Sequence, residues 1–146
     1  MLFASMLTAD LVVFAPDLPQ MRLAVEVRIG AFDRKDAIQQ MKVYMNRRDC
    51  PVALLVTPER TWLLRNTYDG TGPDSIEEAG EYPTSVLLGL DDVPDDEREL
   101  VQTTEIWLER LTSGSAANVG SEARGDVSRY VLPAVTEGRV ASGSLR

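Results

Sequence analysis

The stretch that decides the fold is residues 23–29, which read Leu23-Ala24-Val25-Glu26-Val27-Arg28-Ile29. Because successive side chains of a strand point to opposite faces, this order puts Val25, Val27 and Ile29 on one face and Glu26 and Arg28 on the other. A shorter apolar run, residues 11–14, precedes it across about six turn residues. The pattern predicts a β-hairpin, and therefore an antiparallel pair of strands.

The residues after this hairpin predict a helix and two further strands. Asp33 is a suitable N-cap, and apolar residues recur at three- and four-residue spacing between residues 34 and 47. Residues 52–56 form a continuous apolar run typical of a strand covered on both faces, and residues 61–64 follow after a tight turn. The order is β-β-α-β-β. We therefore expect an α/β (α+β) fold with a mixed sheet of about four strands flanked by helices.

The second half of the chain is less regular. Residues 68–83 contain three glycines and two prolines without periodicity, which predicts a loop. Helical spacing returns over about residues 95–111. We expect residues 1–112 to form one domain, and residues 113–146 to be a Ser/Gly/Ala-rich linker and C-terminal segment. Whether that segment packs on the domain stays open at this point.

Composition excludes several kinds of chemistry. The 146 residues suit one domain, and they include a single cysteine and no histidine. An internal disulfide, a Ser-His-Asp triad and a His-rich metal site are thereby excluded. The chemistry left uses carboxylates, Lys, Arg and Tyr, which suits oxygen-liganded ions such as Mg²⁺. The apolar residues 1–7 lack the basic flank of a signal peptide and are too few for a membrane span, so we expect a cytoplasmic protein with no membrane partner.

Charge divides the chain in two. Residues 1–67 contain nine basic and seven acidic residues, a net charge of +2, whereas residues 68–146 contain six basic and 16 acidic residues, a net charge of −10. The overall charge of −8 argues against a protein that coats nucleic acid. A mildly basic first half is nevertheless compatible with a local DNA-facing surface.

The predicted hairpin brings two acids together. Asp10 stands at the start of the first strand and Glu26 near the end of the second, so antiparallel pairing makes their carboxylates converge. Together with the backbone carbonyl of Val27 they form a partial shell for Mg²⁺, which keeps several waters. Arg28 projects from the same face as Glu26 and would stabilise a phosphoryl oxygen.

The helix adds two polar groups to this candidate site. Gln40 and Tyr44 are four residues apart, so both lie on one helix face and would reach toward the strand pair. Each of these features has an ordinary alternative. An acid and a cation two residues apart are common on any half-exposed strand, and Gln40 and Tyr44 also fit the edge of a helix that packs on a sheet.

Taken in order, these segments resemble the PD-(D/E)XK nuclease superfamily. The resemblance rests on Ala9-Asp10, Glu26-Val27-Arg28, the helix segment from Gln40 to Tyr44, and the strand at residues 52–56. The Gln-x-x-x-Tyr helix is similar to that of the branch with RecB-like nucleases and the N-terminal nuclease domain of type I restriction enzyme motor subunits. The resemblance covers about residues 8–66, and its motifs are short.

The resemblance implies a restriction-endonuclease-like fold and Mg²⁺- or Mn²⁺-dependent hydrolysis of DNA phosphodiesters, as an endonuclease or exonuclease of restriction or repair type. By position, Asp10, Glu26 and the Val27 carbonyl would hold the metal, and Gln40 and Tyr44 would contact the nucleic acid and the metal site.

The chain departs from the family pattern in two ways. Arg28 occupies the position of the motif lysine, and arginine does not act as a base. Only nine residues precede Asp10, where family members usually have a helix and a strand. The alternative is a catalytically inactive nuclease-fold module that binds protein or nucleic acid. Its protein partner would be another protein or a second copy of this chain.

Overall fold

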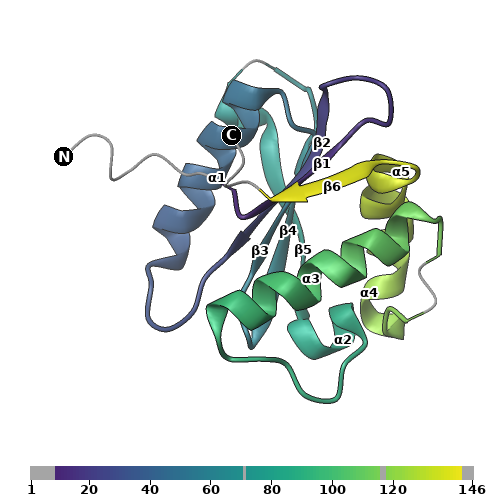
Figure 1. Cartoon of the computed structure of the whole chain (residues 1–146). Helices are drawn as coiled ribbons and strands as arrows, with labels where there is room; N and C mark the ends of the chain where they lie inside the picture. Colours follow the sequence, from purple (N-terminus) through teal and green to yellow (C-terminus); the bar gives the residue numbers. More distant parts are fainter. Residues whose placement is uncertain (1–8, 71, 116–117, 143–146) are drawn as a thin grey trace.

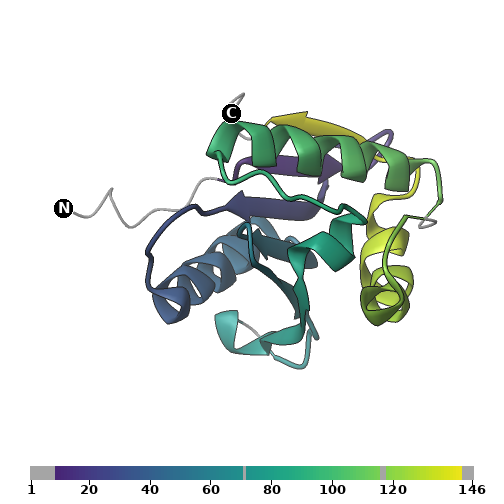
Figure 2. The ribbon, with the colours of Figure 1, turned by 90° about the horizontal axis from the view of Figure 1, so that it is seen from below.

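A six-stranded mixed sheet lies between one long helix on one face and a group of helices on the other (Figures 1 and 2). The computed structural model describes residues 9–70, 72–115 and 118–142. The α/β class agrees with the sequence, but the expectation of about four strands is wrong, because two strands from the second half of the chain extend the sheet at its edges.

The centre of the sheet is built from the four segments that read as strands. These are β1 (Leu11–Phe14), β2 (Met21–Val27), β3 (Val52–Val56) and β4 (Arg60–Asn66), and the full sheet order is β5-β4-β3-β2-β1-β6. β1 pairs antiparallel with β2, and β2 pairs parallel with β3. A parallel pair needs a crossover connection, which α1 (Arg34–Arg48) supplies.

Helix α1 begins and ends at capping residues. The Asp33 side chain accepts a hydrogen bond from the backbone N–H of Asp36, and Asp49 ends the helix in a left-handed conformation. The residues that α1 buries against the sheet, Ala37, Ile38, Met41 and Met45, follow the three- and four-residue spacing of the sequence. They form a second core with Val12, Ala24, Leu55 and other residues on this face of the sheet.

The opposite face of the sheet carries the larger core. Here lie α2 (Thr84–Leu88), α3 (Glu97–Thr112), α4 (Ser121–Asp126), a π-helical turn (Val127–Val131) and α5 (Leu132–Val135). The π-helical turn comes just before Pro133, whose nitrogen has no hydrogen to donate to the preceding turn. Ala123, Val127, Val131 and Val135 are fully buried in this core. Most of the segment expected as a linker therefore packs on the sheet.

Residues 68–83 are not one loop. A short 3₁₀ turn (Pro73–Ser75) leads into the edge strand β5 (Ile76–Pro83), which pairs antiparallel with β4. This strand is not predicted from the sequence, because the segment is rich in glutamate, a residue that is depleted in strands. Three of these glutamates instead form surface ion pairs with arginines: Glu77 with Arg65, Glu78 with Arg34, and Glu81 with Arg60.

The other edge of the sheet is formed by the C-terminal segment. β6 (Arg139–Ser142) pairs antiparallel with β1, so that Ser142 lies opposite Leu11. The turn before β6 approaches β1 closely, because a Cβ added to Gly138 would lie 2.7 Å from Val13 Cγ1 and 2.9 Å from the carbonyl oxygen of Phe14. The edge beside β1 is thus filled by β6.

Two sequence expectations concern residues 1–8 and membranes. The apolar N-terminal stretch lies outside the described residues. Among the residues that the structure describes, no helix is long and apolar enough to cross a membrane.

Candidate functional site

The strand register brings Asp10 and Glu26 together. Leu11 lies opposite Val25, so Asp10, one residue earlier, stands across from Glu26. The Asp10 backbone N–H donates to the Val25 carbonyl at 2.8 Å, and its carboxylate Oδ2 accepts from the Val27 N–H at 2.7 Å. The Asp10 side chain is therefore held against the end of β2 by a charge-assisted hydrogen bond.

Glu26 is a buried carboxylate with one unsatisfied oxygen. The residue is 8% exposed, on the sheet face that α1 covers. Its Oε2 accepts a hydrogen bond from Arg28 Nε at 2.7 Å, whereas its Oε1 is buried without a hydrogen-bond partner among the described residues. Burial, and next the nearby Asp10 charge, raise the pKa of Glu26 to about 7 against the lowering effect of Arg28.

Arg28 lies between Glu26 and solvent. Its backbone N–H donates to the Val56 carbonyl at 2.9 Å, which fixes the residue just beyond the parallel pairing of β2 and β3. Its side chain is 34% exposed and forms the ion pair with Glu26. A guanidinium stays protonated at neutral pH, so at this position it supplies charge and hydrogen-bond donors and cannot accept a proton.

Gln40 and Tyr44 make their observed contacts away from the two acids. Gln40 Nε2 donates to Asp36 Oδ2 at 2.9 Å, one turn earlier on α1, and the Tyr44 hydroxyl donates to Met21 Sδ at 3.7 Å. Both residues are half-buried. The structure thus brings Asp10, Glu26, Val27 and Arg28 into direct contact, while Gln40 and Tyr44 line the same side of the sheet through other partners.

The acid pair consists of groups that could hold a hard divalent cation. The buried Oε1 atom of Glu26 lacks a hydrogen-bond partner, and a carboxylate next to a second carboxylate gains stability from a shared cation. No group of three or more His, Cys, Asp and Glu side chains with metal-binding geometry occurs within the described part of the chain. Two carboxylates such as Asp10 and Glu26 could still hold an ion such as Mg²⁺, which takes one or two carboxylates and completes its shell with water.

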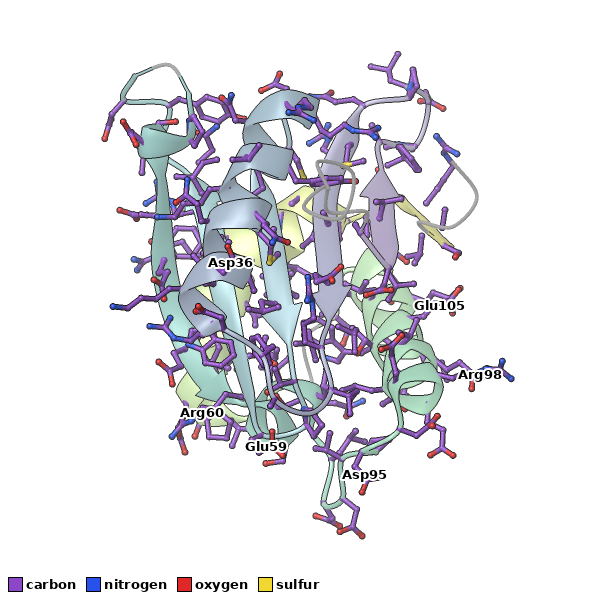
Figure 3. The ribbon with its side chains drawn as sticks, turned by 90° about the vertical axis from the view of Figure 1, so that its left-hand side faces the viewer. Asp36, Glu59, Arg60, Asp95, Arg98 and Glu105 are labelled. Atoms are coloured by element: carbon purple, nitrogen blue, oxygen red, sulfur yellow. The ribbon has the colours of Figure 1, made fainter. Side chains whose placement is uncertain are left out.

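Helix α1, which covers the face of the acid pair, carries more basic than acidic residues. Figure 3 looks onto this face, with α1 lying in front of the sheet. Along α1, five basic residues stand against the single acid Asp36. On the opposite face, α3 carries Glu97, Glu99, Glu105 and Glu109 against two arginines. The two helices on opposite faces of the sheet therefore differ in charge.

Sequence reasoning missed a cavity on this face. It lies beside the C-terminal end of α1, and its lining includes Phe14, Met21, Tyr44 and Arg48. These residues come from three elements, so no local motif marks the cavity. The one available signal in the sequence is the four-residue spacing of Tyr44 and Arg48. In the structure, the Arg48 guanidinium stacks on the Tyr44 ring, with its Cζ atom 5.4 Å from the ring centroid.

Comparison of the chain with protein-family models, with curated proteins and with solved structures finds no match.

Proposed function

We propose that this chain is a PD-(D/E)XK-like nuclease domain that hydrolyses DNA phosphodiester bonds with Mg²⁺ or Mn²⁺ bound at Asp10 and Glu26. The observation that carries the proposal is the juxtaposed acid pair, in which Glu26 has a buried and unpartnered Oε1 and a pKa raised to about 7. Burying two adjacent carboxyl groups lowers the stability of the fold. Groups with perturbed pKa values also concentrate at functional sites.

The surrounding charge supports a DNA substrate. DNA binding depends on basic groups that contact phosphates, and α1, on the face of the acid pair, carries five of them, of which Arg34 is already paired with Glu78. The acidic helix α3 packs on the other face of the sheet (Figure 1). The net charge of −8 is therefore no obstacle to binding on the α1 face.

Each residue has a role that its position allows. The carboxylates of Asp10 and Glu26, with the carbonyl of Val27, would hold the ion, and the Val27 N–H keeps the Asp10 carboxylate oriented. Arg28 would turn from Glu26 to a phosphate oxygen, where its fork of donors stabilises the developing charge. The bound ion would polarise the phosphate and make a coordinated water more acidic. Gln40 and Tyr44, on the same side of the sheet, would contact the DNA further along the strand.

The test combines metal binding with cleavage. In wild-type protein, Mg²⁺ or Mn²⁺ should raise the thermal midpoint, because an ion that binds only the folded state stabilises it by RT ln(1 + [L]/Kd). Glu26→Gln should abolish both the midpoint shift and cleavage of plasmid and linear DNA, while circular dichroism shows that it still folds. Glu59→Gln, at an exposed turn labelled in Figure 3, is the matched control and should behave as wild type.

Arg28→Lys tests the position that departs from the family pattern. A lysine there provides a group whose pKa can fall enough to exchange a proton, so cleavage should increase. Arg60→Lys makes the same change at an exposed position on β4 and should leave cleavage unaltered. If neither wild type nor Arg28→Lys cleaves DNA with either ion, hydrolysis is refuted.

One observation favours a second candidate function, a nuclease-fold module that binds nucleic acid without cleaving it. The 2.7 Å ion pair between Arg28 and Glu26 already neutralises one of the two carboxylates that a metal needs. A binding module of this kind should bind DNA, but should show neither cleavage nor a midpoint shift with Mg²⁺ or Mn²⁺.

A further inference from the structure

A cavity of about 430 Å³ opens between the C-terminal end of α1 and the edge of the sheet formed by β2, β1 and β6. This volume lies in the range of small-ligand sites. The lining combines the Phe14 and Tyr44 rings with the thioether of Met21, and the charged residues Arg48 and Asp49. A site with flat apolar walls and a few charged groups suits a ligand that is itself flat, with polar edges and an attached charge.

The two aromatic rings are both accompanied by guanidinium groups. Arg48 stacks on Tyr44 with its Cζ atom 5.4 Å from the ring centroid, and Arg139 stacks on Phe14 at the same distance. Arg139 is held in this position by hydrogen bonds to the carbonyls of Ala15 and Leu18. Aromatic rings with adjacent arginines are the combination that binds stacked bases and their phosphates.

The polar groups of the lining match the edges of a base. Asp49 follows α1 in a left-handed conformation, and Gln20 stands at the end of the β1–β2 turn; both are exposed, and both line the cavity. A carboxylate accepts hydrogen bonds from exocyclic amino groups, and an amide both donates and accepts. Arg48, also exposed, would bind the phosphate attached to such a base.

The cavity is also at a suitable distance from the acid pair. Asp10, Val12 and Phe14 alternate along β1, and Val12 and Phe14 pack on the α1 face of the sheet and line the cavity. At about 3.3 Å per residue, Val12 lies about 7 Å and Phe14 about 13 Å along the strand from Asp10. A nucleic-acid strand that follows β1 would reach the cavity within a few nucleotides of the acids.

We infer that this cavity binds one base of single-stranded DNA, with the base in contact with the Phe14 and Tyr44 side chains and its phosphate at Arg48. The inference rests on the proposed function for the identity of the ligand, and it adds a preference for an unpaired strand. A paired base in a duplex is stacked on its neighbours and cannot enter such a cavity unless it is flipped out.

The experiment measures binding of a fluorescent single-stranded oligonucleotide of about ten nucleotides, in EDTA so that neither metal binding nor cleavage contributes. Tyr44→Ala should weaken binding at least about five-fold, as expected for the loss of one stacking contact. Tyr130→Ala is its matched control, because Tyr130 is also half-buried under an arginine but packs on the opposite face. Its affinity should stay within about two-fold of wild type.

A second pair of variants separates the cavity from general attraction to phosphates. Arg47 and Arg48 are both exposed at the end of α1, but Arg48 lines the cavity and Arg47 does not. Arg48→Ala should weaken binding several-fold more than Arg47→Ala. For an oligonucleotide of abasic residues, the two variants should have the same affinity. Because Arg48 is exposed, this comparison stays informative even if Tyr44→Ala fails to fold.

Three outcomes overturn the inference: equal losses for Arg47→Ala and Arg48→Ala, equal affinity for abasic and normal strands, or duplex binding as tight as single-strand binding. The proposed function fails separately. If the cavity variants behave as expected but Mg²⁺ and Mn²⁺ support no cleavage, the base site stands and hydrolysis is refuted. If DNA is cleaved but the cavity variants bind normally, hydrolysis stands and the base site is refuted.

Discussion

Replacing Glu26 by Gln should remove a pH dependence of stability that the acid pair imposes on the wild-type protein. The pKa of Glu26 is raised from 4.5 to about 7 in the folded state, first by burial and then by the Asp10 charge. The folded state therefore holds a proton on Glu26 between these pH values, while the unfolded chain has released it. The contribution of Glu26 to stability is therefore largest below about pH 4.5, decreases as the pH rises to about 7, and is constant above that.

The size of this effect follows from the two pKa values. A difference of about 2.5 pH units at 1.36 kcal/mol per unit corresponds to about 3 kcal/mol of lost stability. Because the Glu26 side chain is only 11% exposed, solvent screening reduces this figure little. We expect the difference in unfolding free energy between wild type and Glu26→Gln to change by about 3 kcal/mol from about pH 4 to about pH 8.

Urea denaturation across this pH range measures the effect, since the glutamine keeps the shape and a carbonyl acceptor for Arg28 but cannot titrate. The Glu59→Gln curve should run parallel to that of wild type, because Glu59 lies exposed in the turn between β3 and β4. A wild-type minus Glu26→Gln difference that is flat with pH, or that favours wild type at higher pH, would refute the description of the buried acid pair.

Other predictions test the packing around the site. Gly138→Ala should lower the stability measured by thermal unfolding by about 1–3 kcal/mol, because its Cβ would meet β1 and backbone oxygens. Gly125→Ala is the control: a Cβ there meets open space, so this variant should be neutral or slightly stabilising. Cys50 is buried and its pKa is raised to about 12, so mass spectrometry should find it unmodified by iodoacetamide until urea unfolds the protein. Thr84→Val should cost about 1–3 kcal/mol in urea unfolding, because the buried hydroxyl of Thr61 loses its partner at 2.8 Å.

The central elements could be predicted because their local and long-range preferences agree. Helix α1 has its N-cap at Asp33 and buries the residues that its spacing marks as apolar. The alternation at residues 23–29 and the short turn before it favour the hairpin, and the hairpin alone is enough to put Asp10 across from Glu26. The register of the hairpin and the alternation of side chains along each strand were therefore sufficient to predict the acid pair.

The edge strands could not be predicted, because partners far away in the sequence stabilise them. β5 carries Glu77 and Glu78 in positions that suit a strand only when Arg65 and Arg34 lie beside it. β6 has four residues with a single large apolar side chain, Val140, too few for a recognisable period. Both strands exist because β4 and β1 offer unpaired backbone groups at the edges of the central sheet.

The side-chain contacts of the helix were also beyond sequence reasoning. The four-residue spacing correctly puts Gln40 and Tyr44 on one side of α1, yet it leaves open which of several neighbours each group contacts. The Gln40 amide binds Asp36, which stands four residues earlier on the helix, and the Tyr44 hydroxyl meets Met21 on β2. A choice among neighbours depends on rotamers, which spacing does not determine.

The pairing of β6 with β1 has a consequence for how the protein is made. Val13 is paired with Val140, which is far later in the chain, so the β1 edge stays open until β6 has been synthesised. Closing so long a loop is slow, and an open strand edge invites pairing with other chains. Refolding at high concentration should therefore compete with aggregation as long as β6 has not paired with β1.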